Sequence, residues 1–436
     1  MSDFLTARNL PWVAADRSVN LLIALLVISQ FARYLGPVEF AEFSLAFTIV
    51  ALLSAVVMFG LQEVVTKDIR NNPGNYERII ITALVMQFLV ACLLCGLYYL
   101  FSAFITLDSG YSDYLSLLIV TLFFKFGETI SVSFDASLKT KFVARARSVI
   151  FFVFAIMKLL SIYYKIPIFY VVALFVIEQL VFLLVLLYLL SRNMRFNTHN
   201  FDLVVAQSYV NRGLPILLSG IVGVLYLKID IFLAYKLVED LNTVGSLAVV
   251  TRLIEAALMV PVILCSALGP RIYQEAEGSS SSFLTKLDLL VKLVTTYTMV
   301  CFLILFLFAE IVIGLLFGEQ FHDSADLLRL HSLVLIFIGF NLSGAKFYIG
   351  KGYLLAGLTR NLIAMALVVI VGVLSAPVFG IYGIALGTLF GVVYAGLLHD
   401  LLYQNANDLF SLKVKSFNLF ANLREILRWK KRKWEF

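Results

Sequence analysis

The sequence contains few charged residues for a chain of its length. Only 14% of its 436 residues are charged, whereas a soluble globular chain carries roughly 25%. Hydrophobic residues account for 61%, and the mean hydropathy is +0.96. Hydrophobic runs of about 18 residues or more recur along the chain, and each is typical of a membrane-spanning helix. These runs exclude a soluble multidomain protein and, because they do not alternate over ~10 residues, a membrane β-barrel.

The sequence also has few residues that could form a redox or metal centre. Its four cysteines, Cys92, Cys95, Cys265 and Cys301, all lie inside hydrophobic runs. Cys92 and Cys95 have the C-x-x-C spacing, but no βαβ pattern surrounds them, so we interpret them as small packing residues of a helix. The four histidines are scattered along the chain and predict no metal site.

Motifs of known catalytic sites are missing as well. The sequence has no P-loop glycine run, no H-E-x-x-H and no G-x-S-x-G. The missing P-loop argues against an ATP-driven pump encoded on one chain. No cleavable signal peptide is evident, so we expect the first apolar run, near Leu21, to be a retained helix. We therefore predict a membrane transport protein that is not an enzyme and needs no cofactor.

The hydrophobic runs predict an all-α membrane protein with about twelve spans. The predicted spans are residues 17–35, 40–61, 79–104, 114–134, 148–164, 168–190, 214–236, 246–268, 291–316, 327–347, 358–375 and 380–402. The longest polar interruption, residues 191–213, separates two halves of six spans each. We therefore predict an N-terminal lobe (1–190), a cytoplasmic inter-lobe loop (191–213), a C-terminal lobe (214–402) and a basic cytoplasmic tail (403–436).

Positive charge is unevenly distributed between the two sides of the predicted spans. The formal net charge is +6, and most of the 34 basic residues fall in segments on the side of the N-terminus. Only Arg33, Lys165, Lys236 and Arg329 lie at the opposite edges. Because basic residues mark cytoplasmic loops, both termini are predicted to be cytoplasmic. The positive charge is thereby explained without a nucleic-acid partner.

The tail combines basic residues with an apolar periodicity. Phe420, Leu423 and Leu427 follow helical spacing, and Trp429 and Trp434 stand among the lysines. Such a helix could lie on the anionic inner leaflet. A solvated tail whose charges only set the topology is an equally good interpretation.

Ionisable residues inside the predicted spans are the strongest functional signal. A charge at the centre of the bilayer costs at least ~2.5–3.5 kcal/mol, so such residues usually face a bundle interior or a hydrated cavity. The basic members are Lys125, Lys158, Lys228 and Arg252. The acidic members are Glu128, Glu178, Asp230, Glu255 and Glu310.

Their spacing separates local ion pairs from other roles. Lys125 and Glu128 are three residues apart, as are Arg252 and Glu255, so each pair shares a helix face and can form a local ion pair. Lys228 and Asp230, two apart, cannot share a face, and Lys158 has no acid at helical spacing. Lys228 and Lys158 are therefore the preferred functional lysines. Glu178 and Glu310 are candidates for ion coupling, kept neutral by burial instead of paired.

A series of short motifs follows the order seen in one family of exporters. The matching segments are Ala32–Pro37, Phe40–Ala46, Gly213–Ser219, Tyr226–Asp230, Val244–Ser246, Arg252–Glu255 with Pro261, Leu316–Phe321, Ala325–Leu328 and Gly380–Ala385. Together they resemble bacterial polysaccharide flippases, the O-antigen (Wzx-type) exporters of the multidrug/oligosaccharidyl-lipid/polysaccharide superfamily. The resemblance covers nearly the whole chain, although each motif alone is loose.

The resemblance implies a specific cargo and a MATE-like architecture. It implies two six-helix lobes around a central cavity in the inner membrane, which opens alternately to either side. The cargo would be an oligosaccharide repeat unit on undecaprenyl pyrophosphate, used for O-antigen, and hence lipopolysaccharide, or for another surface polysaccharide. Membrane lipids, a polysaccharide polymerase and chain-length machinery would be partners.

The resemblance also implies that charged residues of both lobes line the central cavity. Lys228, Asp230, Arg252 and Glu255 stand within matching motifs. Lys125, Glu128 and Lys158 are chosen only by their position in the spans.

Three other functions compete with this prediction. A cation-coupled multidrug exporter of the same superfamily would favour an excess of buried acids, whereas this chain has four basic and five acidic span residues. A flippase for the peptidoglycan precursor usually has more spans. A membrane-embedded polymerase or glycosyltransferase would need a large outer loop, and the loops near 105–113 and 318–326 are short.

Overall fold

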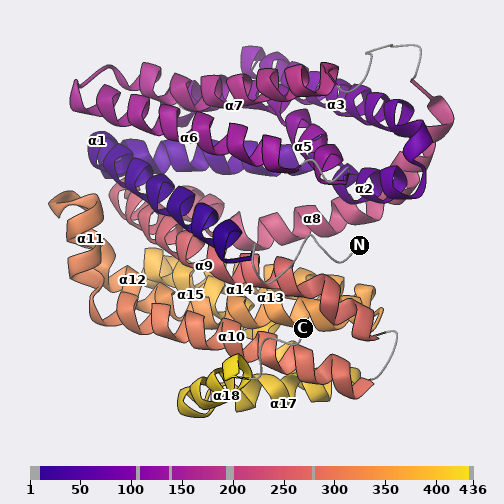
Figure 1. Cartoon of the computed structure of the whole chain (residues 1–436). Coiled ribbons are helices and arrows are strands. Elements are labelled where there is room, and N and C mark those ends of the chain that lie inside the picture. The colour runs from indigo at the N-terminus through magenta and orange to yellow at the C-terminus, as the bar shows by residue number, and fades with distance from the viewer. Residues whose placement is uncertain (1–9, 105–108, 137–139, 193–200, 277–279, 432–436) are drawn as a thin grey trace. The chain divides into compact units, whose positions relative to one another are not determined.

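The computed structural model describes residues 10–104, 109–136, 140–192, 201–276 and 280–431 (Figure 1). Every regular element within these ranges is a helix. Parts of the predicted inter-lobe loop (193–200) and of the tail (432–436, with Trp434) lie outside the described residues.

The elements follow one another along the chain with short connections. They are α1 (Leu10–Met58), α2 (Leu61–Asn71), η1 (Pro73–Asn75), α3 (Tyr76–Phe104), α4 (Ser109–Leu118), η2 (Ile119–Phe124), α5 (Phe126–Ala136), α6 (Thr140–Tyr163), α7 (Ile168–Ser191), α8 (Leu203–Leu237), α9 (Leu241–Ala276), α10 (Ser280–Leu307), α11 (Ala309–Phe317), η4 (Glu319–Phe321), α12 (Ser324–Ser332), α13 (Val334–Gly350), α14 (Leu354–Phe379), α15 (Ile381–Val393), the π-helical turn η5 (Tyr394–Leu398), α16 (His399–Leu402), η6 (Gln404–Ala406), α17 (Asn407–Lys415) and α18 (Leu419–Lys431).

Helical segments cover all the predicted spans. Within the described ranges, ten helices are long and apolar enough to cross a membrane, or eleven if the two parts of α8, Ile216–Gly223 and Lys228–Leu237, form one span bent by 54°. One of the ten, Ile23–Met58, has 36 residues and would be about 54 Å long if straight, which far exceeds the ~30 Å hydrocarbon core. It covers most of the first two predicted spans, and the chain is therefore a multi-pass membrane protein of the predicted all-α class.

The long helix α1 is interrupted between those two spans. Gly36 has φ 76° and ψ 172°, a conformation that glycine adopts without the steric cost of a Cβ. Pro37 follows it and lacks the N–H that a continuing helix would need. This local sequence explains why the two spans separate at residue 36.

One predicted span end is wrong. The ninth span was expected to extend to residue 316, but α10 ends at Leu307 and Phe308 leaves the helical conformation with φ −111° and ψ 24°. The short helix α11 follows and contains Glu310. Continuous hydrophobicity from 291 to 316 concealed this break, because both helices are apolar.

Contacts group the chain into two compact units. One, here called the N-terminal unit, comprises Glu39–Lys228, and the other, the C-terminal unit, comprises Met1–Val38 with Ile229–Phe436. The predicted lobes 1–190 and 214–402 have different limits and stay a prediction.

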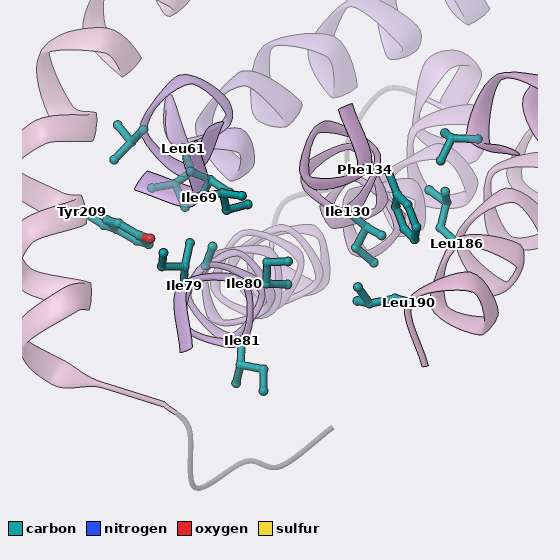
Figure 2. Packing of buried hydrophobic residues seen from close by; sticks show 14 of the residues in the cluster. Leu61, Ile69, Ile79, Ile80, Ile81, Ile130, Phe134, Leu186, Leu190 and Tyr209 are labelled. Carbon is teal, nitrogen blue, oxygen red and sulfur yellow. The ribbon is translucent and has the colours of Figure 1, made fainter. Parts of the chain in front are cut away.

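The core of the N-terminal unit forms where α2, α3, α5, α7 and α8 meet. On α2, the buried residues Leu61, Val65 and Ile69 recur at helical spacing, which gives the helix an apolar stripe. Figure 2 shows the ring of Tyr209 in α8 directed toward this stripe and Ile79. Ile130, Phe134, Leu186 and Leu190 extend the same cluster to α5 and α7.

The core of the C-terminal unit joins α9, α10 and α13. It includes Cys265, Leu287, Val294 and Phe340, all buried. Cys265 and the other three cysteines are free thiols, as expected for packing residues. Close packing of α14 on α15 depends on glycine, since a Cβ at Gly387 would lie 2.7 Å from the carbonyl oxygen of Val368.

Candidate functional site

A cavity of about 490 Å³ lies inside the N-terminal unit. Its walls come from α2, η2, α5, α6 and α7. The charged and amide side chains that line it are Gln62, Lys125, Glu128, Arg147, Glu178 and Gln179. Rings of Phe124, Phe151 and Phe182 complete much of the remaining wall. The cavity therefore combines both signs of charge with aromatic surfaces.

Lys125 and Glu128 form the ion pair predicted from their spacing. Lys125 Nζ lies 3.1 Å from Glu128 Oε1, and the two side chains are 25% and 41% exposed. Gln62 Nε2 of α2 donates a hydrogen bond of 3.3 Å to the second oxygen, Glu128 Oε2. Glu128 occupies the first turn of α5, where a negative charge is favoured by the helix dipole. The pair is held on one side of the cavity.

Arg147 contributes a second cation from the opposite helix, α6. Its guanidinium carbon lies 4.9 Å from the centre of the Phe182 ring, within the range of a cation–π interaction. Its Nη2 donates to Ser131 Oγ over 3.4 Å. The hydrophobic pattern predicts a span that begins only at residue 148, which places Arg147 in a cytoplasmic segment.

A signal for Arg147 was nevertheless present in the sequence. Arg147, Phe151 and Lys158 are spaced by four and seven residues, so a continuous helix places them on one face. Helix α6 begins at Thr140, well before the predicted span. Extending the helical pattern beyond the hydrophobic run would have identified the residue.

Lys158 and Glu178 form a buried ion pair between α6 and α7. Lys158 Nζ bonds Glu178 Oε2, and the side chains are only 5% and 14% exposed. Lys158 Nζ also lies 3.6 Å from the centre of the Phe175 ring. Glu178 lines the cavity, whereas Lys158 stands behind it. The prediction that Glu178 is unpaired is wrong, and Lys158 has an acidic partner that spacing along one helix could not reveal.

The arrangement can contact both charged groups and hydroxyl groups. Arginine presents a planar fork that matches phosphate oxygens, and lysine adds a mobile point charge. Carboxylates and amides can accept and donate hydrogen bonds to hydroxyl groups. The aromatic rings offer apolar faces beside these polar groups.

In the C-terminal unit, Asp230 lies next to a buried histidine. Asp230 is 3% and His331 is 2% exposed, and His331 Nε2 lies 4.0 Å from Asp230 Oδ2. Asp230 Oδ1 accepts a hydrogen bond of 2.8 Å from the backbone N–H of Ile231. The sequence predicts no role for His331, because its partner comes from a helix about a hundred residues away.

The remaining predicted site residues lie elsewhere. Arg252 Nη1 and Glu255 Oε2 are 3.1 Å apart, which confirms their local ion pair. Lys228 is partly buried in the second part of α8. Glu310 is 58% exposed and its Oε1 lies 2.6 Å from Arg329 Nη2, so the expectation of an unpaired buried acid is wrong there too. None of these residues lines the cavity of the N-terminal unit.

A further buried charge pair attaches the tail to the C-terminal unit. Lys413 of α17 and Asp400 of α16 are both 0% exposed and bonded to each other. Lys413 Nζ also donates to the carbonyl oxygen of Gly396 over 2.7 Å, and Tyr348 donates to Asp400 Oδ1 over 2.6 Å. Burial lowers the pKa of Lys413 to about 8, although Asp400 acts in the opposite direction.

Comparison with known proteins gives one family and one fold. The sequence profile of a family described as "Polysaccharide biosynthesis protein" matches residues 7–275. No curated protein matches the chain. The helical arrangement is similar to that of the lipid II flippase MurJ in an inward closed conformation (TM-score 0.72, 15% identity, 95% of each chain covered).

Two transporters of the multidrug class are similar to the same extent. An inward-facing multidrug resistance MATE family transporter of the MOP superfamily gives a TM-score of 0.69 at 14% identity, with 95% of this chain and 96% of the other covered. The eukaryotic MATE transporter AtDTX14 gives 0.68 at 16% identity, with 94% and 98% covered. These likenesses confirm the predicted MATE-like fold.

Proposed function

Because the chain belongs to the polysaccharide biosynthesis protein family, as its motifs predicted, we propose that it is a flippase for lipid-linked oligosaccharides. Its cargo is a repeat unit on undecaprenyl pyrophosphate, used to build O-antigen or another surface polysaccharide. The protein resides in the bacterial inner membrane with both termini in the cytoplasm. The polymerase and chain-length machinery act on the cargo after it has crossed.

The physical problem is the cost of bringing a pyrophosphate and a sugar through hydrocarbon. An isolated charge costs tens of kcal/mol there, and each unpaired hydroxyl costs roughly 2–7 kcal/mol. The observation that carries the proposal is the cavity of the N-terminal unit, whose lining combines Lys125 and Arg147 with Glu128, Glu178 and Gln179. The two cations suit the pyrophosphate, and the acids, amides and aromatic rings suit the sugar. The prenyl chain remains in the lipid.

Transport requires no covalent chemistry in this mechanism. The two lobes open alternately to either side of the membrane, and cargo moves with the change. Lys228, Asp230, Arg252 and Glu255 supply the polar surface of the second lobe. Glu178 remains the candidate for ion coupling because it lines the cavity. Glu310 is a poorer candidate, since it is exposed and paired with Arg329.

A cation-coupled multidrug exporter is the second candidate. The likeness to MATE transporters favours it as strongly as the likeness to MurJ favours a flippase. The two differ in the guest that the cavity must accept. An organic cation requires a net negative lining, whereas the charged lining residues here are two cations and two carboxylates.

Deletion of the gene distinguishes the two functions. A strain without the flippase is expected to lose surface polysaccharide and to accumulate lipid-linked repeat units on the cytoplasmic leaflet, measured by accessibility of the sugar to an added glycosidase in vesicles of each orientation. Complementation should restore both readouts. Normal polysaccharide together with increased sensitivity to cationic drugs would overturn the proposal in favour of drug export.

A further inference from the structure

The tail helices α17 and α18 have one face fixed to the membrane helix α10 (Figure 1). Ser416 Oγ lies 3.1 Å from Thr295 Oγ1 of α10, and Asn422 Nδ2 donates to the carbonyl oxygen of Ser416 over 2.6 Å. Lys292 of α10 bonds both Asp288 and Glu425 of α18. These contacts hold α18 in one orientation against the C-terminal unit.

The same two helices carry exposed apolar side chains. Val414 of α17 and Phe420 and Leu423 of α18 are 45%, 85% and 48% exposed, whereas Phe417 packs edge-on against the buried ring of Phe340. We call Val414, Phe420 and Leu423 the tail strip. Burying a phenylalanine or leucine side chain in an apolar medium gains about 1.5–3 kcal/mol. Exposed apolar side chains grouped in this way mark a place where another apolar phase or partner binds.

The attachment point of the tail on α10 indicates the depth of the tail strip in the membrane. Lys292, which holds Glu425, lies at the start of the predicted span 291–316, about 18 Å along α10 from its first residue. The last predicted span ends at residue 402, just before η6 and α17. The tail strip is thus at the level where the hydrocarbon core begins, on the side where the chain ends.

The residues around the tail strip carry mostly positive charge. From residue 415 onward, seven residues are basic and only Glu425 and Glu435 are acidic. Glu425 is bonded to Lys292, while Lys415 and Arg424 are exposed beside the strip. Basic residues that flank an apolar helix face favour anionic lipid headgroups by ~1 kcal/mol for each Lys or Arg.

We propose that α18 is a binding site for the anionic phospholipid surface on the side of the membrane where the chain ends, with the tail strip in the acyl region and Lys415, Arg424 and the basic residues of α18 on the headgroups. The site needs both the apolar strip and the basic residues. A neutral lipid surface offers no anionic groups to the basic residues, and a partner that remains in water offers no acyl chains to the strip.

Tryptophan fluorescence of the full chain tests this site directly. The sequence has three tryptophans, Trp12, Trp429 and Trp434, so the Trp12→Phe protein reports only on the tail. In nanodiscs of brominated phosphatidylglycerol, its emission should be strongly quenched, and much less so in discs of phosphatidylcholine with the same brominated chains. Both leaflets of a nanodisc are accessible, so the result does not depend on the predicted topology.

Two sets of variants separate the components of the site. Lys430→Gln/Lys431→Gln should weaken binding roughly fivefold for each charge removed, as ~1 kcal/mol per residue implies. Phe420→Ser/Leu423→Ser should reduce quenching at low and at high salt alike, because ions screen the contribution of the charges and not that of the apolar side chains. The matched control, Lys67→Gln/Arg145→Gln, removes two basic residues far from the tail in sequence and should leave the emission unchanged.

Two results would overturn the inference. Equal, weak quenching in both lipids would show a solvated tail. Quenching by the brominated lipid that is lost when a cytoplasmic protein extract is added would show that a protein covers the strip.

Discussion

Lys158 and Glu178 form an ion pair in which the acid faces the cavity and the base lies behind it, against the ring of Phe175. The base therefore fixes the position of a carboxylate that can contact a guest. It also explains how two ionisable groups can be placed in adjacent membrane helices at low cost, because each satisfies the other.

Breaking this pair should destabilise the protein more than removing it entirely. Lys158→Ala leaves Glu178 buried without its cation, and such a loss costs about 3–5 kcal/mol. The double variant Lys158→Met/Glu178→Leu restores apolar packing and should recover most of the stability. Thermal unfolding in detergent measures both effects. A double variant as unstable as Lys158→Ala would contradict this account of the pair.

Arg147→Ala should reduce export of the proposed cargo without unfolding the protein. Losing one hydrogen bond to a charged group costs ~1.5–3 kcal/mol, or roughly 10- to 100-fold in binding. Arg147→Lys should retain part of the activity, since lysine keeps the charge and loses the planar fork. Surface polysaccharide in complemented cells measures the effect. Arg145→Ala, an exposed residue of α6 that does not line the cavity, is the control and should behave as wild type.

Lys228→Ala should abolish surface polysaccharide while the protein still inserts into the membrane. The lysine lies within a predicted span, in the Tyr226–Asp230 segment that resembles the flippase motif, and a partly buried ammonium there suits a pyrophosphate. Lys236→Ala, at the exposed end of the same helix, serves as the matched variant. Normal polysaccharide in Lys228→Ala cells would remove this residue from the transport site.

Lys413 should make the stability of the protein depend on pH above neutrality. Burial lowers its pKa to about 8 in the folded state, whereas an unfolded lysine has a pKa of ~10.4. Between these values the unfolded chain holds more protons, so the free energy of unfolding should rise as the pH increases. Unfolding temperatures at pH 8, 9 and 10 measure the slope, which the Lys413→Met variant should reduce.

Hydropathy predicted the fold well because membrane spans are defined by local composition. It failed where two apolar helices meet without a polar break, as at Phe308. The candidate site was predicted less completely. Lys125 and Glu128 follow from spacing within one helix, but the partners of Lys158 and Asp230 come from other helices. The sequence did not identify Arg147 as a site residue, because the hydrophobic run that defines the span begins after it, whereas the helix α6 already begins at Thr140.

The interruption at Gly36 has a consequence for movement. The chain passes between the two compact units only after Val38 and after Lys228. The first crossing follows the left-handed glycine of α1, and the second coincides with the 54° bend of α8. The first crossing therefore lies beside an interrupted helix and the second at a bent one. Because Gly36 already interrupts α1, a change of its backbone dihedrals requires no intact helical turn to unwind.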